Sequence, residues 1–183
     1  MNVNMKLFAL ACTLGAVFAQ CDVAPPSLQE KTQHVYIISD EPSEDGLQRR
    51  LVVGYNADDE TLPGLGLRTH YDSDMLLLND ISEVLVDDHI FTSDVVIPDE
   101  EDHDDDEATD AFILAAWASL FNSWPGTAPV ELMTLTFDVV DMGQESPVRF
   151  TTVSQAAGFE FAGREHHVCA DGHDDLPPLV NNR

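Results

Sequence analysis

The stretch that decides the fold is residues 99–126. Residues 99–110 read DEEDHDDDEATD, residues 111–121 read AFILAAWASLF, and residues 122–126 read NSWPG. Nine of the first twelve residues are acidic, and the segment that follows them is almost wholly apolar. Apolar side chains gain free energy by leaving water, whereas unpaired carboxylates must stay in it. We therefore expect one element that enters a core directly from a wet, strongly negative loop.

The acidic loop is a candidate site for a hard cation. Calcium takes six to eight oxygen ligands, and Asp residues spaced by one or two positions supply several of them from a single loop. The ligands we predict are Asp102, Asp104, Asp106 and Asp110. The loop lacks the glycine and the terminal glutamate of an EF-hand, so it is not that motif. The alternative is a solvated acidic run that holds no ion.

The composition limits the class of partner. The chain has 183 residues, enough for one domain, and 34 acidic residues against 8 lysines and arginines give a formal net charge of -26. Such a charge would repel nucleic acid and anionic membrane surfaces. It suits a soluble protein in a salty or calcium-containing medium, where counter-ions screen its self-repulsion. The alternative is that the acidic surface only keeps a secreted protein soluble.

The N-terminus has the pattern of a signal peptide. Lys6 is followed by an apolar run over residues 7–19, which is too short to cross a bilayer. We expect cleavage before Gln20 and a secreted protein, and no later apolar run predicts a membrane span. A lipid anchor on Cys21 is the alternative.

The predicted signal peptide determines which of the three cysteines remain in the mature protein. Cys12 would leave with the signal peptide, so Cys21 and Cys169 form the remaining pair, and we predict a disulfide between them. Two free thiols, or lipidation of Cys21, are the alternatives. The nearby His166, His167, Asp171 and His173 add ligand types for zinc or copper, but an ordinary surface tail is the favoured interpretation.

Short strands separated by turn residues dominate the rest of the chain. Alternating or β-branched segments predict strands at 34–38, 50–55, 65–71, 75–78, 84–86, 91–97, 130–140, 148–153 and 159–161. This spacing favours an antiparallel sandwich or barrel. Residues 111–121 are ambiguous, because their propensity favours a helix while their continuous apolar character also fits a central strand. We predict a signal peptide at 1–19, a lead-in at 20–32, a β-sandwich at 33–168 and an acidic tail at 169–183.

Several segments resemble cohesin domains. Residues 64–73, GLGLRTHYDS, resemble the strand and Tyr-Asp turn of that family, and Ala115 to Ala118 resemble its Ala-Trp-Ala strand. Residues 132–139 and 150–159 resemble its alternating strand and its closing hairpin. The likeness spans about residues 35–161. It is greatest to a variant in extracellular bacterial proteins, in which an Asp-rich loop ending in Thr-Asp precedes the Ala-Trp strand and Trp-Pro-Gly follows it.

The resemblance implies a fold and a class of function. It implies an all-β, antiparallel jelly-roll β-sandwich of about nine strands, in which residues 111–120 form a central strand and Trp117 is buried. It also implies a non-enzymatic module for extracellular adhesion or assembly that binds a dockerin-like protein or a polysaccharide. The sequence departs from the family in containing no dockerin segment and no linker to a second module, so it does not identify the partner.

Two other functions stay open from the sequence. A carbohydrate-binding module would use exposed aromatic or imidazole rings, for which the candidates are Trp124, Tyr71 and His70, although packing is their favoured role. A secreted hydrolase would use two facing carboxylates in a cleft, but the chain contains no Gly-x-Ser-x-Gly, phosphate-loop or dinucleotide motif. A smooth apolar sheet face with a polar rim would favour protein binding.

Overall fold

The computed structural model describes residues 30–59, 61–86, 90–93, 96–141 and 146–163. These residues form twelve β-strands and no helix, so none of them belongs to a helix that could cross a membrane. The predicted signal peptide, Cys21, Cys169, the segment 166–173 and the acidic tail lie outside the described residues. The predictions that depend on them stay predictions.

Two five-stranded sheets make up the sandwich, and the first is built around β1, β2 and β10. Its strand order is β12-β1-β2-β10-β5. The strands are β1 (Thr32–Pro42), β2 (Gln48–Ala57), β5 (Leu76–Ser82), β10 (Val130–Val139) and β12 (Glu160–Gly163). All pairs in this sheet are antiparallel except β1 with β12, which is parallel.

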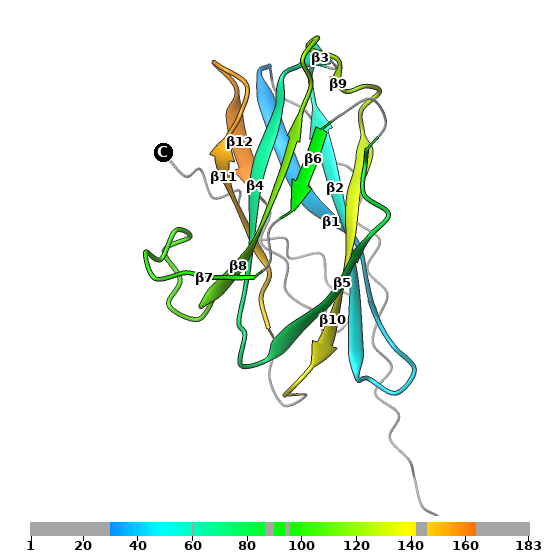
Figure 1. Cartoon of the computed structure of the whole chain (residues 1–183), viewed down its shortest axis with the longest axis vertical. Coiled ribbons are helices and arrows are strands. Elements are labelled where there is room, and N and C mark those ends of the chain that lie inside the picture. Colours follow the sequence, from blue (N-terminus) through cyan, green and yellow to red (C-terminus); the bar gives the residue numbers. More distant parts are fainter. Residues whose placement is uncertain (1–29, 60, 87–89, 94–95, 142–145, 164–183) are drawn as a thin grey trace, which may run out of the picture.

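The second sheet contains residues 111–118, the apolar segment that follows the acidic loop. Its order is β11-β4-β8-β6, and β7 also pairs with β8. The strands are β4 (Gly64–Tyr71), β6 (Ile90–Ser93), β7 (Ile97–Pro98), β8 (Ala111–Ala118) and β11 (Arg149–Ser154), all antiparallel. A small third pair, β3 (Thr61–Leu62) with β9 (Trp124–Pro125), lies near one end of the sandwich (Figure 1).

The core lies between the two sheets and follows the two-residue period of the strands. On β4, Leu65, Leu67 and Tyr71 are at most 1% exposed, and on β10 Leu135 and Phe137 are fully buried. Because side chains alternate across a strand, Gly66, Arg68 and His70 of β4 face outward. The alternation that predicted strands 65–71 and 130–140 therefore also fixes which side chains form the core.

The ambiguous segment is a strand. β8 is paired with β4 on one side and with β6 and β7 on the other, and Trp117 is 2% exposed. Its indole Nε1–H donates to the carbonyl oxygen of Leu85 at 3.0 Å. The prediction of a buried central strand is thus confirmed, and the helical propensity is overridden by pairing on both edges. The strand ends at Ala118, two residues before the predicted end, and Leu120 is 80% exposed.

Three details of the predicted fold need correction. Residues 84–86 do not form a strand, although the Leu85 N–H donates to the carbonyl of Leu132. The sheets are not wholly antiparallel, because β1 pairs with β12 in parallel. The structure has twelve strands rather than about nine. The difference is the two-residue strands β3, β7 and β9, which are too short to give a sequence pattern, and the other nine strands match the predicted number.

Candidate functional site

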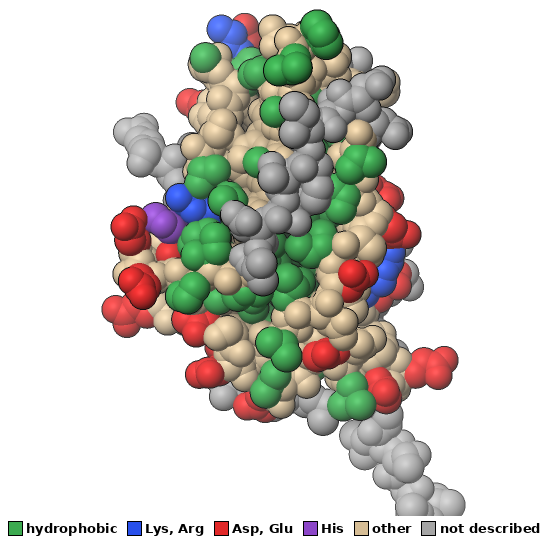
Figure 2. Space-filling model, in the orientation of Figure 1, with side chains coloured by type: hydrophobic (Ala, Val, Ile, Leu, Met, Phe, Trp, Pro, Cys, Tyr) green, Lys and Arg blue, Asp and Glu red, His purple; other side chains and the backbone are tan. Residues whose placement is uncertain are grey.

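The acidic loop, residues 99–110, folds onto the outer side of the second sheet. The Asp99 N–H donates to the Asp110 carbonyl at 2.8 Å and closes the loop at its base, where β7 and β8 pair. Asp102 and Asp105 have φ of 51° and 58°, in the left-handed region that Asp tolerates in tight turns. The loop between β7 and β8 projects from the side of the sandwich in Figure 1, and acidic side chains gather there in Figure 2.

His70 is the residue that the loop covers. It lies on β4 among the outward-facing positions, yet its side chain is 0% exposed. Its ring stacks near Phe112 of β8, with centroids 5.5 Å apart, and the His103 ring of the loop lies against the same Phe112. The outward face of a sheet is thus locally a buried interface between the sheet and the loop.

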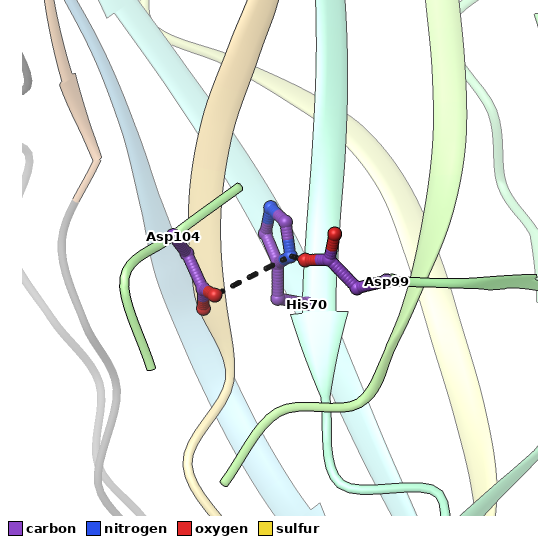
Figure 3. A group of neighbouring side chains, drawn as sticks. All are labelled: His70, Asp99 and Asp104. Carbon is purple, nitrogen blue, oxygen red and sulfur yellow. Dashed lines mark hydrogen bonds and ion pairs between the residues drawn. The ribbon is translucent and has the colours of Figure 1, made fainter. Parts of the chain in front are cut away.

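Three side chains meet at this interface. The Nδ1 atom of His70 lies 2.9 Å from Oδ2 of Asp99 and 3.8 Å from Oδ1 of Asp104. Its Nε2 atom lies 2.7 Å from the hydroxyl oxygen of Thr151 on β11. Figure 3 shows the imidazole of His70 on its strand, with the two carboxylates directed toward it from separate parts of the loop. We call His70, Asp99 and Asp104 the buried triad.

Burial dominates the electrostatics of the triad. Burial lowers the pKa of His70, although the neighbouring carboxylates of Asp104 and Asp99 act in the opposite direction. Burial raises the pKa of Asp104, while the Thr109 hydroxyl, which donates to Asp104 Oδ2 at 2.7 Å, acts to lower it. Both shifts disfavour the charged forms, as expected for ionisable groups removed from water.

The predicted calcium ligands have different partners. Asp106 pairs with the Arg149 guanidinium at 3.3 Å, and Asp110 accepts from the backbone and hydroxyl of Ser73 at 2.7 Å each. Asp102 is exposed, and Asp104 belongs to the buried triad. Within the described ranges, the triad is the one group of three or more His, Cys, Asp or Glu side chains whose ligand atoms lie within 4.8 Å of one another. The calcium set stays a prediction, and the structure brings only Asp104 of its four members into that group.

Sequence reasoning missed the roles of His70 and Asp99. Asp99 lies at the start of the quoted stretch but looks there like any other exposed carboxylate, whereas its side chain is 0% exposed. His70 is 29 residues away along the chain and comes from another strand. Only the β4–β8 pairing, which sets His70 opposite Phe112, brings it beneath the loop.

The residues considered for sugar stacking are all buried, Trp124 and Tyr71 in the core and His70 beneath the acidic loop. Trp124 and His70 are fully buried and Tyr71 is 1% exposed, so the favoured packing role is the correct one. Trp124 packs against Tyr55 with ring centroids 4.5 Å apart. Among the side chains whose exposure the structure describes, which exclude those of residues 87–95, the one large aromatic exposed to solvent is Phe121.

The triad and Thr151 also resemble a carboxylate–imidazole–hydroxyl relay of the kind used in nucleophilic catalysis. A nucleophile has to reach its substrate, however, and Thr151 is only 5% exposed. The Asp104 carboxyl, whose pKa is raised, faces the interior of the loop rather than a cleft, since its side chain is 3% exposed. The closed loop therefore does not offer these groups to a substrate.

Beyond the loop, the second sheet presents a partly exposed surface of small and apolar residues. Gly66 allows this, because a Cβ there would lie 2.6 Å from Cγ2 of Val153, which covers it. Strand register sets Gly66 opposite Ala116, and Arg68 opposite Leu114. We define the outer face as the apolar and rim residues Gly66, Arg68, Leu114, Ala116, Ala118 and Val153. Its rim is polar, since the Arg68 guanidinium lies over the Phe112 ring at 5.5 Å and the acidic loop adjoins it.

The chain was compared with known proteins. Neither a scan of protein families nor a search of curated proteins finds a match. Among solved structures, it is similar to the seventh ScaB type I cohesin from Pseudobacteroides cellulosolvens, at 12% identity and a TM-score of 0.46 over 80% of this chain and 98% of that one. It is also similar to a cohesin module from a Clostridium perfringens ATCC13124 family 33 glycoside hydrolase, at 14% identity and a TM-score of 0.41 over 81% of this chain and 90% of that one. Both of these solved structures are cohesin modules, the family whose motifs this sequence resembles.

Proposed function

We propose that this protein is an exported, non-enzymatic binding module, and that it binds a protein partner on the outer face of the second sheet. The partner has an apolar centre and a basic rim. A dockerin-like module in extracellular adhesion or assembly is the class that the sequence resemblance implies. Calcium bound by the acidic loop would support the fold.

The observation that carries the proposal is the partly exposed apolar surface beside a dense negative charge. Val153 is 46% exposed and Ala118 is exposed, and the side chains of β4 on this face include glycine where a bulky residue would break the surface. Protein interfaces commonly combine such an apolar centre with a polar rim. Figure 2 shows hydrophobic side chains next to blue and purple ones and to the red acidic loop.

The charge of the loop selects the partner's chemistry. Exposed carboxylates of Glu100, Glu101 and Asp105 adjoin the outer face, and the chain as a whole carries a net charge of -26. Complementary lysines or arginines on a partner would speed association and fix its orientation. A polysaccharide-binding face would instead offer a strip of exposed aromatic rings, and the described parts of both sheets do not contain one.

The test measures binding to immobilised dockerin modules and, in parallel, to immobilised polysaccharides by biolayer interferometry. We compare the wild-type protein with Ala116→Arg, which adds bulk and positive charge at the centre of the outer face. Leu77→Arg is the matched control, because Leu77 is 57% exposed on β5 of the other sheet.

The expected result is binding to a protein module that Ala116→Arg weakens at least tenfold, or about 1.4 kcal/mol, and that Leu77→Arg leaves unchanged. Raising the salt concentration should weaken binding further by screening the acidic rim. Binding to polysaccharides alone, or loss of protein binding only in Leu77→Arg, would contradict the proposal.

A further inference from the structure

We propose that the buried triad is a binding site for a zinc-type first-row divalent cation, held by Nδ1 of His70 and one carboxylate oxygen each of Asp99 and Asp104. The site differs from the calcium set in position, in its histidine ligand and in its burial. It does not depend on the proposed protein partner.

Asp104 provides the first argument. Its Oδ1 atom is buried and has no hydrogen-bond partner among the described residues, although Oδ2 accepts from the Thr109 hydroxyl. The residue is 7% exposed, and Oδ1 is directed at Nδ1 of His70 from 3.8 Å, beyond hydrogen-bonding distance. A buried carboxylate oxygen without a partner costs free energy, so an acceptor aimed at two other ligand atoms indicates a missing cation.

His70 provides the second argument. In neutral imidazole one nitrogen donates and the other accepts. Thr151 Oγ1 lies 2.7 Å from Nε2, and its hydroxyl satisfies Nε2 in either tautomer, because it can accept or donate. Without an ion, an Nδ1–H can donate to Oδ2 of Asp99 at 2.9 Å; with the proton on Nε2, the Nδ1 lone pair points toward the two carboxylates. A metal ion bound to that lone pair would take the place of the Nδ1 proton, and a hydrogen bond from the far nitrogen is the usual way in which a ligating histidine is oriented.

The distances suit a small ion. Zinc binds nitrogen and carboxylate oxygen at about 2.1 Å, which places ligand atoms about 3.0 to 3.4 Å apart for octahedral to tetrahedral angles. The two separations from Nδ1, 2.9 Å to Asp99 and 3.8 Å to Asp104, bracket that range. Side-chain movements of a few tenths of an ångström would make the two separations equal.

Charge and ligand type distinguish zinc-type ions from calcium. Two carboxylates and a neutral imidazole carry a charge that one divalent cation cancels, and burial makes that cancellation valuable. Calcium prefers six to eight oxygens at 2.3–2.6 Å, whereas imidazole nitrogen suits zinc and its first-row neighbours. His103 supplies a nearby fourth donor, since its Nε2 lies 4.0 Å from Oδ1 of Asp99 and its side chain is only 28% exposed.

A bound ion would cross-link the second sheet and the acidic loop. The ion would connect His70 on β4 to two points of the acidic loop. These points are Asp99 and Asp104, which lie on either side of residues 100–103. The loop would then be fixed against Phe112 at the border of the outer face. We expect metal removal to loosen the loop while the two sheets stay folded, since their core lies on the other side of β4.

The experiment uses the full-length secreted protein, stripped with chelator and titrated with Zn²⁺ by isothermal calorimetry, with Co²⁺ as a spectroscopic probe. We expect one ion per chain and cobalt d–d bands of a nitrogen–oxygen site. Asp104→Asn and Asp99→Asn should weaken Zn²⁺ binding by about a hundredfold or more, since losing even a ligand's hydrogen-bond partner costs 10- to 100-fold.

Asp105→Asn is the matched control. It removes the same charge from the adjacent, exposed position of the same loop, and it should leave Zn²⁺ affinity within about twofold. If Asp104→Asn does not fold, the stoichiometry of Zn²⁺ binding and the Co²⁺ spectrum of the wild-type protein still test the proposal. Zn²⁺ binding equally weakened in Asp105→Asn, a wild-type protein that binds no Zn²⁺ or Co²⁺, or a nitrogen NMR spectrum of His70 with protons on both nitrogens in the presence of Zn²⁺ would overturn the proposal.

Discussion

At the scale of single residues, close approach of two strands makes Gly64 a position where only glycine fits. Its φ is +138°, and a Cβ there would collide with the carbonyl oxygen of Trp117 and lie 2.9 Å from Cα of Ala118. Gly64 begins β4 and is paired with Ala118 at the end of β8. The contact therefore lets the β4–β8 pairing extend to this end of the sheet.

We predict that Gly64→Ala lowers the free energy of unfolding by about 2–4 kcal/mol, because backbone strain and overpacking act together. Gly126→Ala is the control: Gly126 also has a positive φ, +89°, but no atom lies within 4 Å of the added Cβ. It should cost about 1 kcal/mol from strain alone. Chemical denaturation of both variants measures the difference, and equal losses would mean that the contact with Trp117 is unimportant.

A second residue-scale prediction concerns Tyr71. Burial raises its pKa to about 12 from an ordinary value of 10.0, with a smaller contribution from Asp110. The unfolded chain therefore loses the phenolic proton first, so the stability that Tyr71 contributes is full below pH 10 and is lost as the pH rises toward 12. One pKa unit corresponds to about 1.4 kcal/mol, so the loss approaches roughly 3 kcal/mol once the pH exceeds 12.

Tyr71→Phe removes that titration. Urea denaturation of both proteins between pH 8 and pH 11 should show the wild-type stability falling faster above pH 10. Tyr55, whose pKa is also raised by burial, is common to both proteins and cancels in the comparison. Parallel curves for wild type and variant would contradict the prediction.

At the scale of elements, the sequence predicts the strands well and the loop poorly. Alternation over 65–71 and 130–140 is read directly from residue types, because large apolar side chains recur at every second position over much of each strand. For β8 the composition favours a helix, and the strand follows only from the family resemblance, since its two paired edges are contributed by distant segments. The burial of Asp99 and Asp104 also depends on distant segments. His70 on β4 and Thr151 on β11 lie beneath the loop that carries these two residues.

The central position of β8 gives an element-scale prediction. Ile113 is fully buried in the core, whereas Leu120, two residues beyond the strand, is 80% exposed. Ile113→Ala should cost about 2–5 kcal/mol of unfolding free energy, and Leu120→Ala should stay within about 0.5 kcal/mol. Thermal and urea denaturation of the pair measure this contrast. A helix packed through a different register would instead make both substitutions comparable in effect, and such a result would contradict the strand.

At the scale of the whole molecule, the dominant feature is a net charge of -26 around a hydrophobic core. Few cations compensate it locally. Arg49 pairs with Asp40 at 2.9 Å, and Arg149 pairs with Asp106 at 3.3 Å. Much of the remaining negative charge on the surface therefore has to be neutralised by ions from the solvent. Stability should therefore depend on which cations the medium contains, through two separable mechanisms: general screening and specific binding.

Our last prediction separates these mechanisms for calcium. The crowded carboxylates of the acidic loop repel one another, and a divalent ion bound to the folded form alone would stabilise it by RT ln(1 + [L]/Kd), about 2.7 kcal/mol at a hundredfold excess over Kd. We expect a higher melting temperature in calcium than in magnesium or in sodium of equal ionic strength, for a protein first stripped of metals. Asp106→Asn, which lies outside the buried triad, should reduce the calcium effect and leave zinc binding intact, whereas Asp104→Asn should reduce both. Melting temperatures that are equal in all three salts would mean that the exposed carboxylates are only solvated, because screening depends on ionic strength and not on the identity of the ion.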